Sequence, residues 1–190
     1  MNIPEFIIFT GPMFGSKTTN LLAVVDRYRY QNKRIAAFKP MLDDRYSEGK
    51  IVTHNGGSID AHIVTSGEDI LNFIKNNDEF DVVAVDEAFM IDGISTVLVD
   101  LFKKGITIVI SSLELSASCA PFDNIQEILP WATKIQKCPA VCTSCGRDAY
   151  YTHRKIDNLD EIAIGGSDLY EPRCWYHHGA MNQKESSTND

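Results

Sequence analysis

A short apolar run, Phe6 to Phe9, leads into a glycine-bearing loop, and the loop leads into a stretch with helical periodicity. A strand, a glycine loop and then Lys-Thr at a helix start turn backbone N–H groups and a helix N-terminus toward an anion. We therefore expect a nucleotide-phosphate site in which Lys17 reaches the β- and γ-phosphates and the Thr18 hydroxyl binds Mg²⁺. The loop residues expected to hold the nucleotide are Gly11, Pro12, Met13, Phe14, Gly15, Ser16, Lys17 and Thr18.

The loop departs from the usual phosphate-loop pattern in one place. The pattern G-x-x-x-x-G-K-[ST] has glycine immediately before lysine, whereas here Gly15 precedes Ser16. A glycine-rich turn capped by Ser or Thr is the alternative interpretation, and the position directly after a strand favours the phosphate loop. Because a Cβ is unfavourable where φ is positive, we expect the double change Gly15→Ser and Ser16→Gly to improve ATP affinity or kcat/KM by roughly 5- to 150-fold.

Apolar runs alternate with helical stretches along the first part of the chain. Short, nearly unbroken apolar strands separated by helices are typical of parallel strands buried on both faces. The sequence therefore predicts an α/β fold with a mostly parallel sheet. Strands are expected at 6–9, 35–38, 82–85 and 106–110, and helices at 21–30, 70–74 and 94–102.

Three segments depart from this alternation. Residues 43–49 have loop composition, and His54-Asn55-Gly56-Gly57 between the apolar runs 51–53 and 59–64 predicts a hairpin and an extra β-ribbon. From Cys138 onward the periodicity fades and cysteines cluster, which indicates a small lobe held by something other than a core. We expect a nucleotide-binding domain at 1–138, the small lobe at 139–180 and a disordered polar tail at 181–190.

Charge and composition restrict the partners. The 190 residues include 18 Lys and Arg against 26 Asp and Glu, a net charge of −8, which disfavours nucleic acid as the main partner. No apolar window is long enough to span a membrane, and no basic segment precedes an apolar one at the N-terminus. Five cysteines is an odd number, which fits a reducing compartment better than a disulfide framework. The sequence therefore predicts a cytoplasmic protein that binds neither nucleic acid nor membrane.

Two carboxylates follow the apolar strand 82–85. In open α/β sheets, ligands bind beyond the carboxyl ends of the strands, so Asp86 would lie near Gly11 if the two strands are neighbours. Asp86 could then hold Mg²⁺ directly or through water, and Glu87 is left for another task. The alternative is an acidic pair that complements a helix N-terminus. The phosphate loop favours the metal and base interpretation.

The cysteines of the small lobe form a C-x-x-C pair followed by a C-x-x-H pair. The ligand set Cys142, Cys145, Cys174 and His177 supplies three thiolates and one imidazole, which suits a closed, structural Zn²⁺ site. Twenty-eight residues separate the two pairs, so a long loop is expected between them. His178 could replace His177, although the two-residue spacer favours His177. A redox C-x-x-C is the other alternative, and Cys119 and Cys138 are expected to be ordinary buried thiols.

The motifs together resemble a known family, the type II thymidine kinases of the human cytosolic, bacterial and poxvirus kind, and a viral or phage member in particular. The resemblance runs from Phe6 to His177. It rests on Gly11-Pro12-Met13-Phe14 with Lys17-Thr18, Asp44-Arg45-Tyr46, Thr53-His54, Asp86-Glu87, Pro121-Phe122, the segment 140–145, Tyr151-Thr152, the segment 164–170 and the segment 174–177.

This resemblance implies a RecA-like phosphate-loop domain and a zinc-held lobe whose long loop, the lasso, closes over the nucleoside. It implies that the lasso backbone holds the thymine, with Tyr170 over the sugar or base, and that Arg45 lies near the phosphates. The substrate-binding residues that it implies are Met13, Met90, Leu113, Phe122, Thr152, Ile164, Gly165, Gly166, Ser167, Asp168 and Tyr170. The family usually has Ser-Gly before the loop lysine, and Gln and Phe at the positions of Phe89 and Met90.

The implied reaction is transfer of the ATP γ-phosphoryl group to the 5′-hydroxyl of thymidine. Lys17, Mg²⁺ and Arg45 would neutralise charge, and Glu87 would accept the hydroxyl proton. The resemblance also implies a homotetramer and feedback inhibition by dTTP. Two alternatives stay open: a recombination-type NTPase motor coupled to DNA, and a non-enzymatic zinc-ribbon module bound to nucleic acid.

Overall fold

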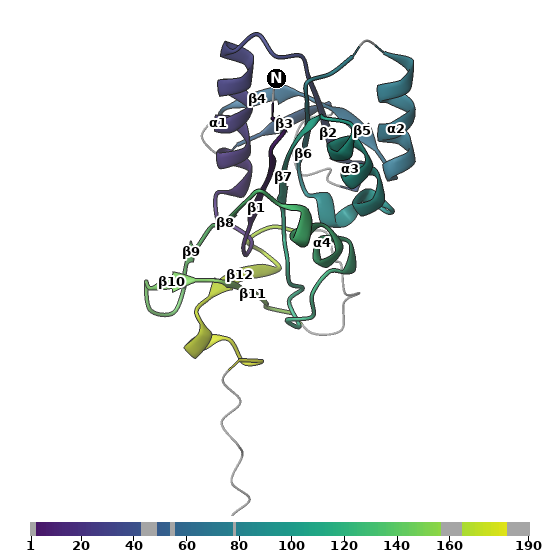
Figure 1. The fold of residues 1–190 in the computed structure, drawn as a ribbon. Coiled ribbons are helices and arrows are strands. Elements are labelled where there is room, and N and C mark those ends of the chain that lie inside the picture. Colours follow the sequence, from purple (N-terminus) through teal and green to yellow (C-terminus); the bar gives the residue numbers. More distant parts are fainter. Residues whose placement is uncertain (1–2, 43–48, 54–55, 78, 157–164, 182–190) are drawn as a thin grey trace, which may run out of the picture.

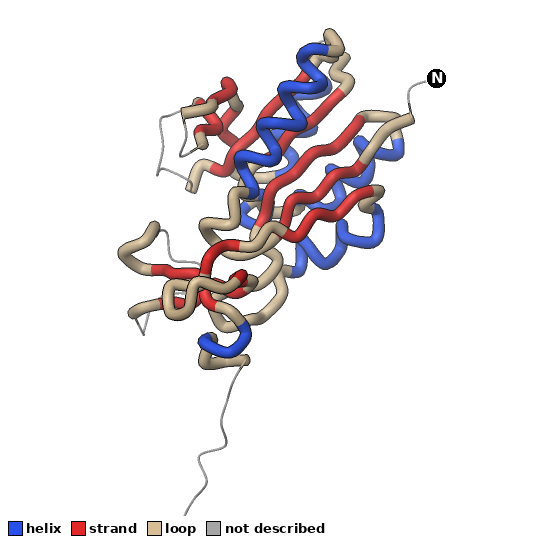
Figure 2. Tube along the Cα trace, turned by 90° about the vertical axis from the view of Figure 1, so that its left-hand side faces the viewer, coloured by secondary structure: helices blue, strands red, loops and turns tan. Residues whose placement is uncertain are grey.

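The computed structural model describes residues 3–42, 49–53, 56–77, 79–156 and 165–181. Six strands form one sheet, and every neighbouring pair in it is parallel, so the predicted α/β class is confirmed (Figure 2). From one edge to the other, the strands are β5 (His62–Val64), β2 (Ile35–Pro40), β6 (Val82–Val85), β7 (Thr107–Ser112), β1 (Phe6–Thr10) and β8 (Lys134–Lys137).

Helices cover both faces of this sheet (Figure 1). The helix α1 (Lys17–Tyr30) lies on one face, and α2 (Gly67–Asn76), α3 (Ile94–Lys103) and α4 (Asp123–Ile128) lie on the other. Three short 3₁₀ turns complete the described helices: η1 (Ala88–Met90), η2 (Leu129–Trp131) and η3 (Trp175–His177). None of the helices in the described part of the chain is long and apolar enough to cross a membrane.

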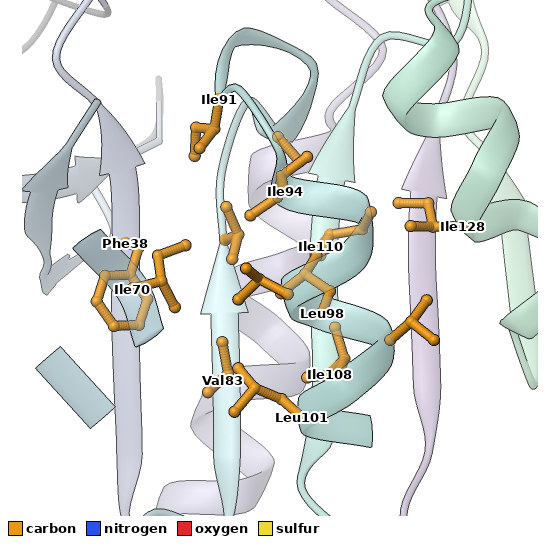
Figure 3. Packing of buried hydrophobic residues seen from close by; sticks show 14 of the residues in the cluster. Phe38, Ile70, Val83, Ile91, Ile94, Leu98, Leu101, Ile108, Ile110 and Ile128 are labelled. Carbon is orange, nitrogen blue, oxygen red and sulfur yellow. The ribbon is translucent and has the colours of Figure 1, made fainter. Parts of the chain in front are cut away.

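The core has two layers, one on each face of the sheet, because strand side chains alternate between the faces. Phe38, Val83 and Ile108 point toward α2 and α3, where they pack with Ile70 and Leu98 (Figure 3). On the other face, Ile7, Phe9, Ala37, Ala84 and Val109 pack with Leu21, Leu22 and Val25 of α1. The sheet is therefore anchored on both sides, and its carboxyl edge is held rigidly enough to carry a site.

The β-ribbon predicted between residues 51 and 64 is present with one correction. The strands β3 (Lys50–Val52) and β4 (Ser58–Asp60) pair antiparallel, while the predicted turn residues His54 and Asn55 lie outside the described residues. The run 59–64 is not one strand, however. It breaks at Ala61, and β5 leaves the ribbon to join the edge of the main sheet beside β2, where Ile63 and Val64 continue the parallel ladder.

The strand order does not meet the condition under which Asp86 was expected to lie near Gly11. The strands that carry the phosphate loop and Asp86, β1 and β6, are not neighbours, because β7 lies between them. Their carboxyl ends nevertheless reach the same edge of the sheet, because all three strands are parallel. The start of α1 extends over this edge and closes the distance to Asp86.

The residues after β8 form a small lobe below the carboxyl edge of the sheet (Figure 1). It consists of two antiparallel pairs, β9 (Ala140–Val141) with β10 (Asp148–Ala149) and β11 (Tyr151–Arg154) with β12 (Tyr170–Arg173). Among the described residues of the lobe, its own buried apolar cluster consists of Ala140, Cys142, Ala149 and Cys174. So small an apolar cluster needs another source of rigidity.

Candidate active site

The phosphate loop packs directly on the backbone of the residue that follows β8. A Cβ placed on Gly11 would lie 2.3 Å from the carbonyl oxygen of Cys138, and one on Gly15 would lie 2.5 Å from the same oxygen. Gly11 also has φ +131°, which side chains rarely adopt. The Cys138 N–H donates to the Thr10 carbonyl at 2.7 Å, so this contact is built into the sheet. Both glycines are therefore required by packing.

Non-glycine residues of the same loop have left-handed backbone conformations. Phe14 has φ 66° and Ser16 has φ 57°. Ser16 is the N-cap of α1, and its side chain makes no capping hydrogen bond. Such conformations are costly for residues with a Cβ and cluster at ligand sites in proteins. The expected strain at Ser16 is thus present, while Gly15 serves a packing role.

A hydroxyl and a carboxylate meet at the start of α1. The Thr18 Oγ1 donates to Asp86 Oδ1 and Oδ2 at 3.0 and 3.2 Å, and the Ser111 hydroxyl donates to the same carboxylate. Hydroxyl and carboxylate oxygens are the hard donors that Mg²⁺ prefers. Thr18 and Asp86 therefore fit a magnesium site, and β7 contributes a third oxygen through Ser111.

A cavity of about 420 Å³ opens beside this pair. Lys17 is buried on its wall and donates to the Pro12 carbonyl at 2.7 Å, a contact that an arriving phosphate would replace. The lining combines the phosphate loop, two strand ends, the β-ribbon and the small lobe. Its residues are Met13, Phe14, Gly15, Ser16, Lys17, Thr18, Thr19, Lys39, Lys50, Ile51, Val52, Thr53, Asp86, Glu87, Gly166 and Ser167.

Glu87 lines the same cavity and follows Asp86 at the end of β6. Its backbone is left-handed, with φ 50°, and it caps η1. This turn places two consecutive carboxylates on one wall of the cavity. One of them can bind a metal ion, and the other can accept a proton. Asp86 is buried, whereas Glu87 is partly exposed toward the cavity.

Only some of the predicted nucleoside-binding residues lie at this cavity. Gly166 and Ser167 line it, and Thr152 is next to it, since the Met13 N–H donates to Thr152 Oγ1 at 3.0 Å. Met90, Leu113 and Phe122 instead pack against the core beneath α2 and α3, and the Phe122 ring lies 4.7 Å from that of Phe89.

The remaining predicted residues lie on the loop side of the lobe. A Cβ placed on Gly165 would overlap the Leu169 side chain, and the Gly166 N–H donates to Asp168 Oδ1 at 2.9 Å, which lowers the pKa of that carboxyl. Tyr170 is buried, with the Arg154 guanidinium 5.8 Å from its ring centre. Arg45 and Ile164 lie outside the described residues.

The four predicted zinc ligands converge. The ligand atoms of Cys142, Cys145, Cys174 and His177 lie within 4.8 Å of one another. The Sγ atoms of Cys145 and Cys174 are 3.7 Å apart, and Cys142 Sγ is 3.7 Å from His177 Nδ1. A tetrahedral Zn²⁺ with bonds of about 2.0–2.3 Å has ligand separations of roughly 3.5–3.8 Å. The distance from Cys174 Sγ to His177 Nδ1, 3.2 Å, would widen slightly on binding. The cluster therefore fits a structural zinc site.

Local hydrogen bonds prepare this cluster for a metal. Burial raises the pKa of the Cys142 thiol, but N–H groups of Cys174, Ser144 and Cys145 outweigh burial and lower that pKa to about 6. A thiolate is the form that binds zinc. All five cysteines are free thiols in the structure, so none is committed to a disulfide.

His178 is not part of the cluster. It is 2% exposed, and its Nε2 lies 3.0 Å from the Thr152 carbonyl oxygen. Its Nδ1 lies 3.7 Å from the sulfur of Cys119, which is half-buried rather than fully buried as predicted. The choice of His177 over His178 is thus supported by geometry. Within the small lobe, His178 holds β11 at Thr152, whose hydroxyl accepts from the Met13 N–H of the phosphate loop.

Sequence reasoning missed part of the cavity wall. Lys39, Lys50 and the β3 residues Ile51 and Val52 line it, and none was predicted to be in the site. Lys39 could have been found by the signal that identified Asp86, because it is a charged residue at the carboxyl end of a buried strand. No comparable sequence pattern pointed to the β-ribbon residues Lys50, Ile51 and Val52.

The family model that matches this chain and the relatives described next carry the same enzyme name. The family model described as thymidine kinase matches residues 5–178. A thymidine kinase of Thermococcus kodakarensis is 37% identical over 181 residues, which cover 90% of this chain and 92% of that protein. A thymidine kinase of Bacteroides fragilis (strain YCH46) is 32% identical over 183 residues, which cover 95% of this chain and 90% of that protein.

Proposed function

Because the chain belongs to the thymidine kinase family, we infer that it transfers the γ-phosphoryl group of ATP to the 5′-hydroxyl of thymidine. The observation that supports this most directly is one cavity lined by both the phosphate loop and Gly166-Ser167 of the small lobe. A donor and an acceptor can therefore meet in it. No comparison favours a DNA-coupled motor or a nucleic-acid-binding module.

We propose that positioning and charge neutralisation supply most of the rate, as phosphoryl transfer requires little covalent help. The loop N–H groups and the start of α1 would hold the phosphates, and Lys17 would leave the Pro12 carbonyl to contact them. Thr18 and Asp86 would hold magnesium. Bound Mg²⁺ would neutralise charge on the β- and γ-phosphate oxygens.

We propose that Glu87 is the general base and removes the proton of the 5′-hydroxyl. Its place on the cavity wall beside Asp86 supports this role. Arg45 remains a proposed phosphate contact from the family resemblance alone. The phosphate-binding residues of the proposal are Gly11 to Thr18, with Asp86 through the metal.

The nucleoside would lie toward the small lobe. We propose that Gly166 and Ser167 contact it from the loop end and that Thr152 supports Met13 from behind. Met90, Leu113 and Phe122 would form the apolar floor deeper in the molecule. Ile164, Gly165, Asp168 and Tyr170 would complete the loop that covers the base.

The lobe is proposed to depend on zinc. Bound Zn²⁺ would join both ends of the long loop, since Cys142 and Cys145 precede it and Cys174 and His177 follow it. This supports the division into a nucleotide-binding part at 1–138 and a small lobe at 139–180. The polar tail at 181–190, a homotetramer, feedback by dTTP, a cytoplasmic location and a viral or phage origin stay predictions.

The test is phosphorylation of radiolabelled thymidine by the purified full chain with ATP and Mg²⁺. Formation of labelled dTMP that depends on both would support the proposal. Parallel reactions measure ATP hydrolysis with and without DNA. Hydrolysis that DNA stimulates and thymidine does not would overturn the kinase and select the motor.

A further inference from the structure

A second lysine is buried at the phosphate site. Among the described residues, Lys17 and Lys39 are the lysines with buried side chains, at 7% and 3% exposed. Both line the cavity that also contains Asp86 and Glu87. A buried ammonium group is expensive to desolvate, so its place on the wall of a ligand cavity calls for a chemical reason.

The sheet register places Lys39 beside Asp86. Phe38 pairs with Val85, and the Asp86 N–H donates to the Phe38 carbonyl at 3.0 Å, so the next residue of each strand continues the ladder. Ala37 and Ala84, two residues earlier, both belong to the core layer on the α1 side. Because strand side chains alternate, Lys39 and Asp86 lie on the same face as the phosphate loop and α1.

The strand order also shows where Lys39 lies relative to the phosphate loop and the Thr18–Asp86 pair. The loop follows β1, the Thr18–Asp86 pair lies at β6, and Lys39 lies near the carboxyl end of β2, one strand further from the loop. With strands about 4.8 Å apart, β2 is roughly 14 Å from β1. Loop N–H groups cradle the α- and β-phosphates, and the metal bridges the β- and γ-phosphates. A metal ion held by Thr18 and Asp86 would therefore lie between the loop and Lys39, and Lys39 would face the γ-phosphoryl group from the far side.

We propose that Lys39 is a catalytic residue whose ammonium group stabilises the γ-phosphoryl group during its transfer. This rests on the proposed thymidine kinase activity. In the step, a bond forms between the 5′-oxygen and the γ-phosphorus, the bond from that phosphorus to the bridging oxygen of ADP breaks, and the hydroxyl proton passes to Glu87. ADP keeps the electron pair of the broken bond. Lys39 neutralises charge on the equatorial oxygens and is itself unchanged.

The test replaces the charge with an apolar chain of similar length, Lys39→Met. We expect kcat to fall about 10²- to 10³-fold, the usual effect of removing one donor from a developing anion. The affinity for ADP, measured by isothermal titration, should stay within about twofold, because ADP lacks the group that Lys39 contacts. Lys17→Met, in contrast, should weaken ADP binding as well.

A matched control comes from the other end of the same two strands. Lys33 precedes β2 and lies 3.3 Å from Asp81, which precedes β6, so the pair joins these strands far from the cavity. Lys33→Met should leave kcat within about twofold of the parent. Lys39→Gln, which keeps a hydrogen-bond donor without the charge, is the second variant if Lys39→Met does not fold.

Each outcome decides the proposal. If the parent is active and Lys39→Met is equally active, the role of Lys39 is overturned and the proposed thymidine kinase activity stands. If the parent does not phosphorylate thymidine, the proposed function itself is overturned. Parallel losses of ADP affinity and kcat would make Lys39 a support for Asp86 and the metal instead.

Discussion

Reversing Gly15 and Ser16 tests whether the phosphate loop is constrained by its neighbours or only by its own sequence pattern. From the sequence, the double change Gly15→Ser and Ser16→Gly was expected to improve ATP binding. The structure argues for the opposite sign. A Cβ at residue 15 would lie 2.5 Å from the Cys138 carbonyl oxygen and 3.2 Å from that of Pro12, both of them backbone atoms that cannot rotate away.

The two substitutions have different magnitudes. The loop must shift by about half an ångström before the Gly15→Ser contact is tolerable, and overpacking of this kind costs roughly 1–3 kcal/mol, or about 5- to 150-fold in affinity. Ser16→Gly removes a left-handed penalty of about 1–2 kcal/mol but adds about 0.4–1 kcal/mol of entropy to the unfolded chain. We therefore expect the double variant to bind ATP about as weakly as Gly15→Ser does.

The assay is ATP affinity by isothermal titration and kcat/KM for the parent, both single variants and the double variant, with thermal unfolding of each. Ser16→Ala is the control that keeps the Cβ and removes the hydroxyl group. We expect weaker ATP binding in Gly15→Ser and the double variant, and equal or slightly tighter binding in Ser16→Gly. A double variant that binds ATP as well as the parent would refute the constraint from Cys138.

Three further predictions concern the base, the metal and the pH dependence. Glu87→Gln should lower kcat by roughly 10²- to 10⁴-fold with little change in ATP affinity, and near-normal turnover would remove Glu87 as the base. Cys174→Ser should lower zinc content, the unfolding temperature and thymidine affinity together, and protein purified without chelator that contains no zinc would contradict the site. The Thr65 hydroxyl and the N–H groups of Thr65 and Ser66 lower the pKa of Asp69. Its contribution to stability is thus fully present above the ordinary pKa of an aspartate carboxyl and is lost as the pH falls through the lowered pKa. Asp69→Asn should therefore flatten the acid side of the stability profile in urea unfolding, and parallel profiles for parent and variant would exclude this role.

The sequence by itself determined the elements and the chemistry that each carries. Apolar strands, the loop before α1 and the C-x-x-C and C-x-x-H pairs are local patterns, and each depends on residues that are close together in the chain. The α/β class, the proposed magnesium pair and the proposed zinc ligands followed from them. Even the choice of His177 over His178 rested on a local feature, the two-residue spacing that favours His177.

Only the tertiary structure decided which of these elements meet. The insertion of β7 between β1 and β6, the register of Lys39 beside Asp86 and the packing of Cys138 under the phosphate loop join residues that are 47 to 127 positions apart. Gly15 illustrates the reason, because its neighbours in the chain suggest a misplaced glycine, whereas the carbonyl of Cys138, over a hundred residues later, leaves no room for a Cβ. Such contacts arise from how the sheet is ordered and covered, and no local period or spacing encodes them.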